Sequence, residues 1–563
     1  MLLLAQLLEK MKINKQKLLT ILLLGVILII ALFVRMYSLS TVPNGFHIDE
    51  ASLGYNGYSL LLTGKDENNN KFPLYINMFG DERPSGYHYL TILPIKVLGL
   101  NEFATRLPGA LFGTLTVISF FFLTLVLFKN KKLSLLSALL VAIAPWQVVL
   151  SRASAETIVA LFFIISGYIF VLLGFKKQRG LYFFVGAFIM LLSFFFYHTP
   201  RVFVPLLFLA TIAYLYPVWK RFKMKERVSL VASFLILSFV SFALVFIVPG
   251  GTGRYSQVNI FGYPAVKLVL AEQIVEGGLM HAPADVTRIF HNKVINYSLA
   301  AISNYSDYFT GKFLFMEGGL PNWYRVPDMG LIYLVELPFI LIGIFYLIIS
   351  KDRYHKLPLL WLLLAPLVAA FTVDDTPNLQ RAIVMFPMIE LFAAYGFIML
   401  LNKFAGIKSK ILLIVVALLL LFNFAYFLQE YFIQAQVDKN WYRNEGFGQM
   451  VKLVKKDYAN YDKIFVTKSY GGIYPLILFY MQYDPSTYQK EGSTKDKEYT
   501  GFGKFYFLVS ACPSAGGDPK VPKVKKAIYI DNGTCPNYEG LQSKKYSYIT
   551  RKDGTRVFRM VYD

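Results

Sequence analysis

The sequence predicts an all-α polytopic membrane protein of about 11 transmembrane helices plus interfacial helices, with a small α/β domain at its C-terminal end. Hydrophobic residues make up 56% of the 563 residues and charged residues only 16%, which excludes an ordinary soluble chain and a disordered one. Long apolar runs recur through residues 1–428, whereas residues 429–563 are more polar. We therefore expect a transmembrane domain over 1–428 and a separate domain over 429–563.

The apolar runs are the membrane spans, because a spanning helix needs about 20 apolar residues. They are 18–36, 105–128, 133–150, 157–174, 181–197, 202–218, 228–248, 331–349, 357–373, 382–401 and 411–428. Five of the connecting loops are short and rich in Lys and Arg, namely 129–132, 175–180, 219–228, 350–356 and 402–410. The positive-inside rule places these loops in the cytoplasm, together with the N-terminal Lys10, Lys12, Lys15 and Lys17. Much of the net charge of +22 is thus a topology signal, and no nucleic acid is expected as a partner.

Segment 87–100 is apolar but too short for an ordinary span. If it crossed the membrane, every basic loop after it would face outward, so we expect an amphipathic helix on the outer surface. Three regions then lie outside the cytoplasm: the loops 37–104 and 249–330 and the C-terminal domain. That domain contains strand-like runs at 463–468, 505–510 and 527–530. This topology predicts a plasma-membrane protein whose functional site lies on the outer side.

Candidate carboxylates stand at the outer ends of the predicted helices. Asp49 and Glu50 follow the first span, and Glu156 precedes the fourth. A carboxylate at the membrane–water boundary can act as a general base when burial and neighbouring charges adjust its pKa. Asp49 and Glu50 could equally serve only to complement the dipole of the helix that they begin.

Basic residues also gather at these outer ends, where the positive-inside rule disfavours them. They are Arg83, Arg152, Arg201 with its neighbour His198, and Arg381. A guanidinium at headgroup level can pair with a lipid phosphate, so the set indicates an anionic ligand. Arg83 could instead be a snorkelling Arg at a helix start, and each of Arg152, Arg201 and Arg381 could instead be the partner of a nearby helix-end carboxylate. The loop residues His281 and His291 lack metal-ligand spacing and are expected to be structural.

The order of these motifs along residues 40–400, all on the outer face, resembles the polyprenyl-phosphate-sugar-dependent glycosyltransferases of the GT-C class. That class includes the protein O-mannosyltransferases and the aminoarabinose transferase of lipid A. The matching motifs are His47–Ala51, Asp81–Pro84, Gly99–Pro108, Pro145–Trp146 with Ser151–Glu156, Tyr197–Arg201 and Thr376–Arg381. Arg83 stands where the aminoarabinose transferase carries a Lys, which keeps the charge but changes its geometry.

The resemblance implies an inverting transfer of a sugar from a polyprenyl-phosphate carrier to an extracytoplasmic acceptor, which could be a protein, a lipid or a cell-envelope glycan. It implies Asp49, Glu50 and Glu156 as the catalytic carboxylates. It further implies that the donor phosphate is bound by Arg83, Arg152, His198, Arg201 and Arg381. No cofactor is required, and a metal is not indicated, although Glu82 and a loop His could coordinate one. Donor, acceptor and membrane lipids are the expected partners.

Two other classes of function remain open from the sequence. A lipid-linked glycan transporter or flippase would also be polytopic, but internal symmetry and polar residues near helix centres would then be expected. A non-catalytic envelope assembly protein would use the C-terminal domain as its binding module. That domain holds both cysteines of the chain, Cys512 and Cys535, and we expect a disulfide between them because the domain faces the oxidising side.

Reporter fusions test the predicted topology. A tag after Asp563 should be accessible only from outside the cell, and a tag within 129–132 only from the cytoplasm, because the basic loops set the orientation. A tag after Asp563 that is accessible from the cytoplasm would contradict the assignment.

Overall fold

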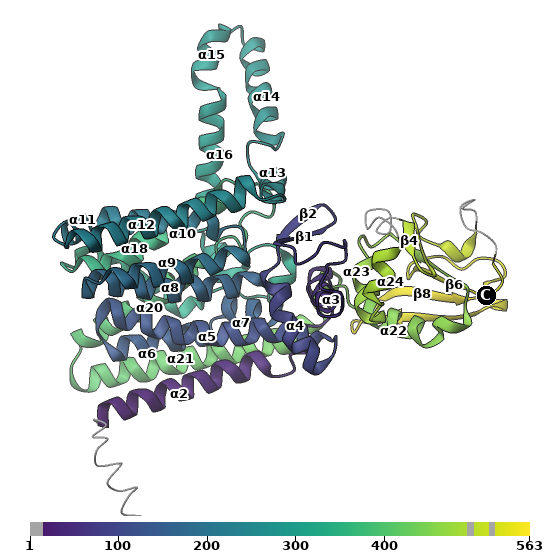
Figure 1. Ribbon diagram of the computed structural model, residues 1–563, viewed down its shortest axis with the longest axis horizontal. Helices are drawn as coiled ribbons and strands as arrows, with labels where there is room; N and C mark the ends of the chain where they lie inside the picture. The colour runs from purple at the N-terminus through teal and green to yellow at the C-terminus, as the bar shows by residue number, and fades with distance from the viewer. Residues whose placement is uncertain (1–14, 492–499, 517–523) are drawn as a thin grey trace, which may run out of the picture.

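The computed structural model describes residues 15–491, 500–516 and 524–563, so Lys10 and Lys12 lie outside the described residues. A bundle of apolar helices runs along the long axis of the molecule, and a β-sheet domain caps one end of the bundle (Figure 1). The expected architecture of a helical membrane domain followed by a small α/β domain is confirmed at this level.

Each predicted span contains helix, but the spans differ in length. In the described part of the chain, six stretches are long and apolar enough to cross a membrane: Lys15–Met36 (α2), Glu102–Phe128 (α5), Glu156–Lys177 (α8), Met224–Ile247 (α12 with a π-helical end), Ile383–Lys403 (η6 and α20) and Gly406–Gln436 (α21 and η7). A seventh is formed if α6 (Lys131–Ile143) and α7 (Pro145–Arg152), bent by 53° to each other, count as one span. Pro145 explains the bend, because a residue before proline avoids helical geometry and Ala144 is accordingly extended.

The remaining predicted spans are shorter helices. Three are the apolar stretches Gly180–Phe195 (α9 and η1), Pro200–Tyr214 (α10) and Leu334–Ile349 (η5 and α17). The last, 357–373, comprises α18 (Arg353–Leu364) and α19 (Leu367–Ala370). A bundle with several helices that are long and apolar enough to cross a membrane is therefore confirmed, while the count of eleven spans stays a prediction.

Close backbone contacts hold the centre of the bundle together. A Cβ added to Gly396 of α20 would lie 1.9 Å from the carbonyl oxygen of Phe339 in α17, and one added to Gly343 would lie 2.0 Å from that of Phe392. Small residues allow such approach between helices in lipid, where packing replaces the hydrophobic effect as the driving force. The spanning stretch of α20 is 89% buried, but those of α2 and α21 are only 17% and 11% buried. The last two helices thus lie on the periphery, with most of their surface available to lipid.

The outer loop 37–104 builds a compact layer on the end of the bundle. It contains α3 (Ile48–Thr63), the antiparallel hairpin of β1 (Tyr75–Met78) and β2 (Asp81–Pro84), and α4 (Gly86–Leu98), which corresponds to the predicted interfacial segment. The second outer loop forms α13 (Gly253–Val258) and then α14 (Ala265–Leu279), α15 (Ala284–Phe290) and α16 (Lys293–Asp307). We call α14–α16 the lateral arm, because it projects sideways from the bundle (Figure 1).

The C-terminal domain is a mixed six-stranded sheet with strand order β4-β5-β3-β6-β8-β7. The predicted runs correspond to β3 (Lys463–Thr467), β5 (Phe505–Leu508) and β6 (Ala527–Asn532), and β3 pairs in parallel with both of the others. The strands that the sequence analysis did not identify are β4 (Gly501–Phe502), β7 (Lys545–Thr550) and β8 (Arg556–Tyr562). The helices are α22 (Phe447–Asp457), α23 (Tyr474–Met481) and α24 (Pro485–Lys490). The predicted boundary at 428/429 falls inside α21 (Gly406–Phe432).

The domain rests on α3 through α23, an apolar helix that is buried over most of its length. The ring of Phe479 lies 4.7 Å from that of Phe46, and it also approaches the backbone of Gly54 so closely that a Cβ there would lie 2.5 Å away. One continuous apolar cluster therefore includes residues of α3 and of the C-terminal sheet. The domain and the outer layer of the bundle share a core, so they are held in a defined relative position.

A disulfide joins Cys512 and Cys535, as the sequence analysis predicted. The bond closes a loop across a sequence separation of 23 residues, next to the buried ion pair between Asp531 and Arg559. Closing a loop of this size restricts the unfolded chain and stabilises the domain by about 3 kcal/mol.

Replacing both cysteines by serine should therefore lower the thermal stability of the C-terminal domain, as measured by the unfolding temperature in detergent. Reduction of the wild-type protein should give the same decrease, and reduction should leave the double variant unchanged. Equal unfolding temperatures for the wild type and the variant would contradict a stabilising role for the bond.

Candidate active site

A cavity of about 920 Å³ opens at the end of the bundle that faces the C-terminal domain. The start of α3, strand β2, the start of α8, the turn before α10, α13 and the segment before η6 all contribute to its wall. The polar residues used below that line it are His47, Asp49, Glu50, Asp81, Arg83, Glu156, His198, Arg201, Arg254 and Arg381. The structure thus brings together seven of the eight site residues predicted from the sequence, all except Arg152.

Asp49 and Arg83 form the central ion pair of this cavity. Asp49 lies in the first turn of α3, whose N-cap His47 accepts a hydrogen bond from the Asp49 backbone N–H. Strand β2 carries Asp81 and Arg83 two residues apart, on the same face. Nη1 of Arg83 lies 3.0 Å from Oδ2 of Asp49, and its Nε lies 2.9 Å from Oδ2 of Asp81. About a quarter of the Asp49 and Arg83 side chains is exposed, so a ligand in the cavity can reach both.

This pairing sets the charge state of Asp49. Burial raises the pKa of the Asp49 carboxyl, but the opposing effects of Arg83 and His47 outweigh burial and hold the pKa below its usual value. For Arg83, burial lowers the pKa, and the carboxylates of Asp49 and Asp81 raise it well above its usual value. Asp49 is therefore ionised at neutral pH, which is the form that a general base requires.

Glu50 has a different environment although it is the next residue. Its side chain is almost fully buried and accepts hydrogen bonds from Nε of Arg106 at 2.8 Å and from Nη2 of Arg443 at 2.9 Å. The same carboxylate also accepts from the His47 N–H, which completes a capping box at the start of α3. Glu50 touches the cavity wall, but its oxygens are occupied by structural partners. Glu50 is thus placed to position the start of α3, and its part in catalysis stays a prediction.

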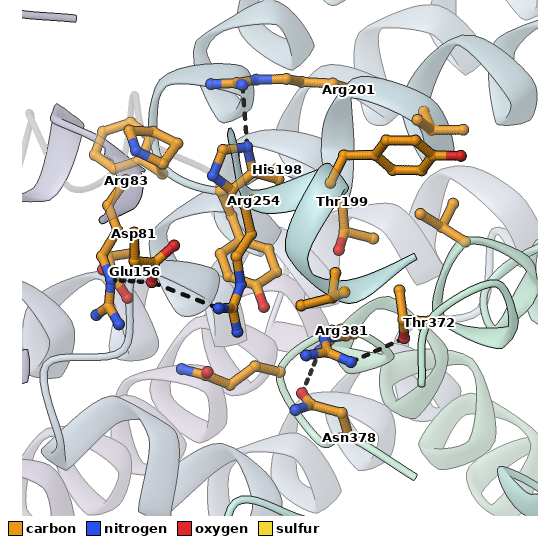
Figure 2. Close-up of a pocket in the computed structure, with 18 of the residues that line it drawn as sticks. Asp81, Arg83, Glu156, His198, Thr199, Arg201, Arg254, Thr372, Asn378 and Arg381 are labelled. Atoms are coloured by element: carbon orange, nitrogen blue, oxygen red, sulfur yellow. Dashed lines mark hydrogen bonds and ion pairs between the residues drawn. The ribbon is translucent and has the colours of Figure 1, made fainter. Parts of the chain in front are cut away.

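Two further basic residues, Arg254 and Arg381, line the same cavity (Figure 2). Arg254 of α13 lies 3.7 Å from Oδ2 of Asp81 and 3.5 Å from that of Asp374. Arg381 donates to Oγ1 of Thr372 at 2.8 Å and to the carbonyl of Asp374. Both guanidinium groups border the cavity, so together with Arg83 they provide a positively charged wall for an anion.

His198 and Arg201 are held by one another and by the backbone. Burial and the nearby Arg201 lower the pKa of His198 to about 3, so its ring is neutral at pH 7. Its Nε2 then donates to the carbonyl oxygen of Glu82 at 3.0 Å, and its Nδ1 accepts from Nη1 of Arg201 at 3.1 Å. Arg201 also donates to the carbonyl of Phe194, and its guanidinium lies over the Tyr75 ring at 4.9 Å. This pair therefore ties β1 and β2 to the start of α10 and so supports Arg83.

Arg152 does not line the cavity, which corrects its predicted role in phosphate binding. Its guanidinium donates to the carbonyl oxygens of Val34, Tyr37 and Val42 and lies over the ring of Phe432. The bend at Pro145 directs α7 back against the chain that follows α2, where these carbonyls need donors. Arg152 thus uses its donors to hold backbone carbonyls. Glu156 does border the cavity, at the first turn of α8 and close to Arg83 (Figure 2).

Several cavity residues were not identified from the sequence. Arg254 follows the seventh predicted span on the outer side, so the charge argument used for Arg201 and Arg381 could have found it. Trp323 stacks on His47 with ring centroids 4.1 Å apart, and Tyr324 adjoins it. They come from the long second loop, and no local pattern places them beside α3. Only the tertiary fold brings them to the cavity.

The sequence analysis also named Glu82 and a loop His as residues that could coordinate a metal. Within the described ranges, no group of three or more His, Cys, Asp or Glu side chains is close enough to hold a metal ion. The side chain of Glu82 accepts a hydrogen bond from Nδ2 of Asn77 at 2.6 Å. His281 and His291 lie in the lateral arm, away from this cavity.

Comparison with known proteins agrees with the resemblance seen in the sequence. Residues 82–246 match the family model described as dolichyl-phosphate-mannose-protein mannosyltransferase. Among solved structures, ArnT from Cupriavidus metallidurans bound to undecaprenyl phosphate matches with a TM-score of 0.52 at 11% identity, covering 97% of this chain and 98% of ArnT. The apo form of the same protein gives 0.50 at 12% identity, with coverage of 96% and 97%. No curated protein matches the chain.

An oligosaccharyltransferase from Archaeoglobus fulgidus matches at 13% identity over 83% of this chain, with a TM-score of 0.49. The match spans only 63% of the length of that protein. The near-complete coverage of ArnT shows that the present chain has the same fold from end to end. The family model covers residues 82–246 only, and the ArnT structures show the fold of the chain.

Substitutions at the two adjacent carboxylates should separate their roles. Glu50→Ala should destabilise the fold by about 3–5 kcal/mol, because it leaves the buried Arg106 and Arg443 without their shared anion. Asp49→Asn should change the stability much less, since Asp49 is partly exposed and Asn keeps its size. Thermal unfolding in detergent measures both effects, and an equal unfolding temperature for the two variants would contradict this division.

Proposed function

We propose that this protein is a membrane glycosyltransferase that moves a sugar from a polyprenyl-phosphate carrier to an extracytoplasmic acceptor. The observation that carries the proposal is the Asp49–Arg83 ion pair, 3.0 Å long, in a cavity whose wall also holds Arg254 and Arg381. A base and several cations in one cavity are what glycosyl transfer from a phosphate carrier needs. The acceptor class, a protein, a lipid or an envelope glycan, is left open by this arrangement.

The shape of the cavity supports a donor with a charged head and an apolar chain. Its polar side comprises the acids and arginines described above. Its other side is lined by Phe242, Val245 and Phe246 at the outer end of α12 and by Val368 and Phe371 of α19 and its end. Phe242 and Phe246 are more than half exposed and continue onto the lipid-facing surface of the bundle. A polyprenyl chain in the membrane can therefore lie against this side while its phosphate reaches the arginines.

In the proposed reaction, an acceptor hydroxyl or amine attacks the anomeric carbon of the donor sugar from the side opposite the phosphate. The new bond to the anomeric carbon forms as its bond to the phosphate oxygen breaks, which inverts the configuration. Asp49 takes the proton of the acceptor, and the bond electrons leave with the polyprenyl phosphate. Arg83, Arg254 and Arg381 stabilise the negative charge that develops on that phosphate.

The ion pair also suggests how donor binding prepares the base. A carboxylate that is paired with Arg83 is a weak base, because the guanidinium stabilises its ionised form. The donor phosphate is a second anion that competes with Asp49 for the same guanidinium. Once Arg83 turns toward the phosphate, Asp49 loses its counter-ion and becomes a stronger base. Binding of donor and activation of acceptor are then coupled through one side chain.

The proposal places the N-terminus in the cytoplasm and the cavity and C-terminal domain outside the plasma membrane, as the loop charges predict. A transporter would need polar groups along a path through the bundle. The acids and arginines of the cavity lie at one end of the bundle instead, which favours an enzyme.

Asp49→Asn should lower the turnover of sugar transfer by a factor of about 10²–10⁴, because Asn cannot accept the acceptor proton. Donor binding should persist or strengthen, since the anion that competes for Arg83 is gone. The measurement is transfer from a synthetic polyprenyl-phosphate sugar in nanodiscs, together with binding of the same donor. Asp438→Asn, at an exposed position outside the cavity, is the matched control. Near-normal turnover of a folded Asp49→Asn would remove this base, and Glu156 would take its place as the candidate.

Arg83→Ala should weaken donor binding and also change the pH dependence. Arg83 lowers the pKa of Asp49, so its removal raises that pKa, and a larger fraction of Asp49 is protonated on the acid side. The acid limb of kcat/KM for the donor, which reports the donor-free enzyme in which Arg83 pairs with Asp49, should therefore move to higher pH. Arg83→Lys should shift it less, and Lys456→Ala, on the exposed side of α22, should not shift it. An acid limb that does not move in Arg83→Ala would contradict the pairing of Arg83 with the base.

A further inference from the structure

The lateral arm buries a polar contact between its helices and exposes many apolar side chains. Between its helices, Nδ2 of Asn296 donates to Oε1 of Gln273 at 3.0 Å, and Asn296 is buried. A Cβ added to Gly277 would lie 2.7 Å from Oγ1 of Thr287, so the helices approach closely at a small residue. In contrast, Leu268, Val275 and Leu279 of α14, Ile289 of α15, and Leu299 and Ile302 of α16 are each more than half exposed. Such an arrangement is unfavourable in water and is typical of helices that meet in an apolar medium.

Hydrogen bonds fix the depth at which the arm leaves the bundle. The N–H of Ile260 donates to the carbonyl of Phe371, and Nδ2 of Asn304 donates to the carbonyls of Ala370 and Thr372. The hydroxyl of Tyr305 reaches the carbonyl of Leu363, inside α18. Both α18 and α19 belong to the bundle, and Phe371 and Thr372 line the cavity, so the arm leaves the bundle beside the cavity. Figure 1 shows the arm running across the direction of the bundle helices, without reaching the C-terminal domain. It is therefore parallel to the plane of the membrane.

The charges of the arm are sorted along the membrane normal. Helix α14 lies closer to the C-terminal domain than α16 does (Figure 1). It carries Lys267, Glu272 and Glu276, all of which are exposed. Helix α16 has no charged residue between Lys293 and Asp307. The helix with charges along its length is thus nearer the C-terminal domain, and α16, whose charges Lys293 and Asp307 stand only at its two ends, lies farther from it, which is the order expected for headgroups and acyl chains.

We propose that the lateral arm lies in the outer leaflet, with α14 at the level of the lipid headgroups and α16 against the acyl chains. Its apolar surface continues that of α12, where Phe239, Phe242 and Phe246 are exposed on the side of the bundle that meets lipid. A lipid leaflet changes from polar to apolar with depth, so it accounts for this order of charges. A protein partner does not require such an order. The inference concerns a surface and does not depend on the proposed chemistry.

The arm also borders the cavity at its root. Val258 of α13 and Phe261, which precedes α14, both line the cavity wall. An arm anchored in the leaflet would hold this wall at a constant depth relative to the lipid phosphates. The lateral arm is then a brace that sets the height of the cavity in the membrane.

Site-specific fluorophores test the proposal, and the chain is suited to them. Both cysteines are joined to each other, so no free thiol competes for a label in the described residues. Single cysteines at Leu299 and Ile302 of α16 and at Glu272 and Glu276 of α14 would each carry an environment-sensitive label in phosphatidylcholine nanodiscs. Lys456→Cys on α22 is the control in the C-terminal domain. All five positions are exposed or solvent-facing on the protein, so labelling should not disturb packing, and unfolding temperatures check this.

Labels on α16 should be quenched by lipids with a nitroxide on the acyl chain and protected from aqueous iodide. Labels on α14 should be quenched most by a headgroup nitroxide, and the Lys456 label only by iodide. Quenching of the α16 labels by iodide would place the arm in water and overturn the proposal. Protection from both quenchers, with a dimer or a bound protein in native mass spectrometry, would show a protein contact and would overturn it as well.

Discussion

The position of the whole candidate site depends on one buried carboxylate, that of Glu50. Its two oxygens bind Arg106 of α5 and Arg443 of the segment after α21, and they also accept from the backbone at the start of α3. Arg106 in turn donates to the carbonyls of Leu39 and Gly45, so it orders the chain that leads into α3. Because Asp49 is the preceding residue, its orientation toward Arg83 follows from this network. Charge burial of this kind is costly, and here it gives a fixed geometry.

The opposite demands on Asp49 and Glu50 explain why adjacent residues differ so much. The carboxylate that positions the helix needs full burial and several donors, which leaves it unable to exchange protons. The carboxylate that we propose as the base, Asp49, needs partial exposure and a partner that can be displaced. A helix start supplies both, since consecutive side chains point about 100° apart around the axis. Within one helical turn, Glu50 thus serves to position the helix and Asp49 is available for the proposed chemistry.

The sequence predicted the elements whose signals are local. Apolar length located the helices, the charges of short loops indicated a common side, and strand-like runs identified β3, β5 and β6. Misplaced arginines led to Arg83, Arg201 and Arg381, all at the cavity. The same argument misled for Arg152, because a guanidinium that satisfies backbone carbonyls has the same sequence signature as one that binds a ligand. Glu50 and Trp323 could not be assigned correctly, since their roles depend on Arg106 and Arg443, which are distant in the chain.

Arg443 links the C-terminal part of the chain to the candidate site. It lies after the change in composition at 428/429, yet it binds Glu50 and donates to the carbonyl of Trp323 in the cavity wall at 2.7 Å. A chain cut at that compositional boundary would keep every predicted span and every cavity arginine. It would nevertheless lose one of the two cations around Glu50 and the support behind Trp323. The change in composition therefore divides the sequence into two parts, but the ion pair between Arg443 and Glu50 joins them. The smallest unit that keeps this ion pair includes residues of both parts.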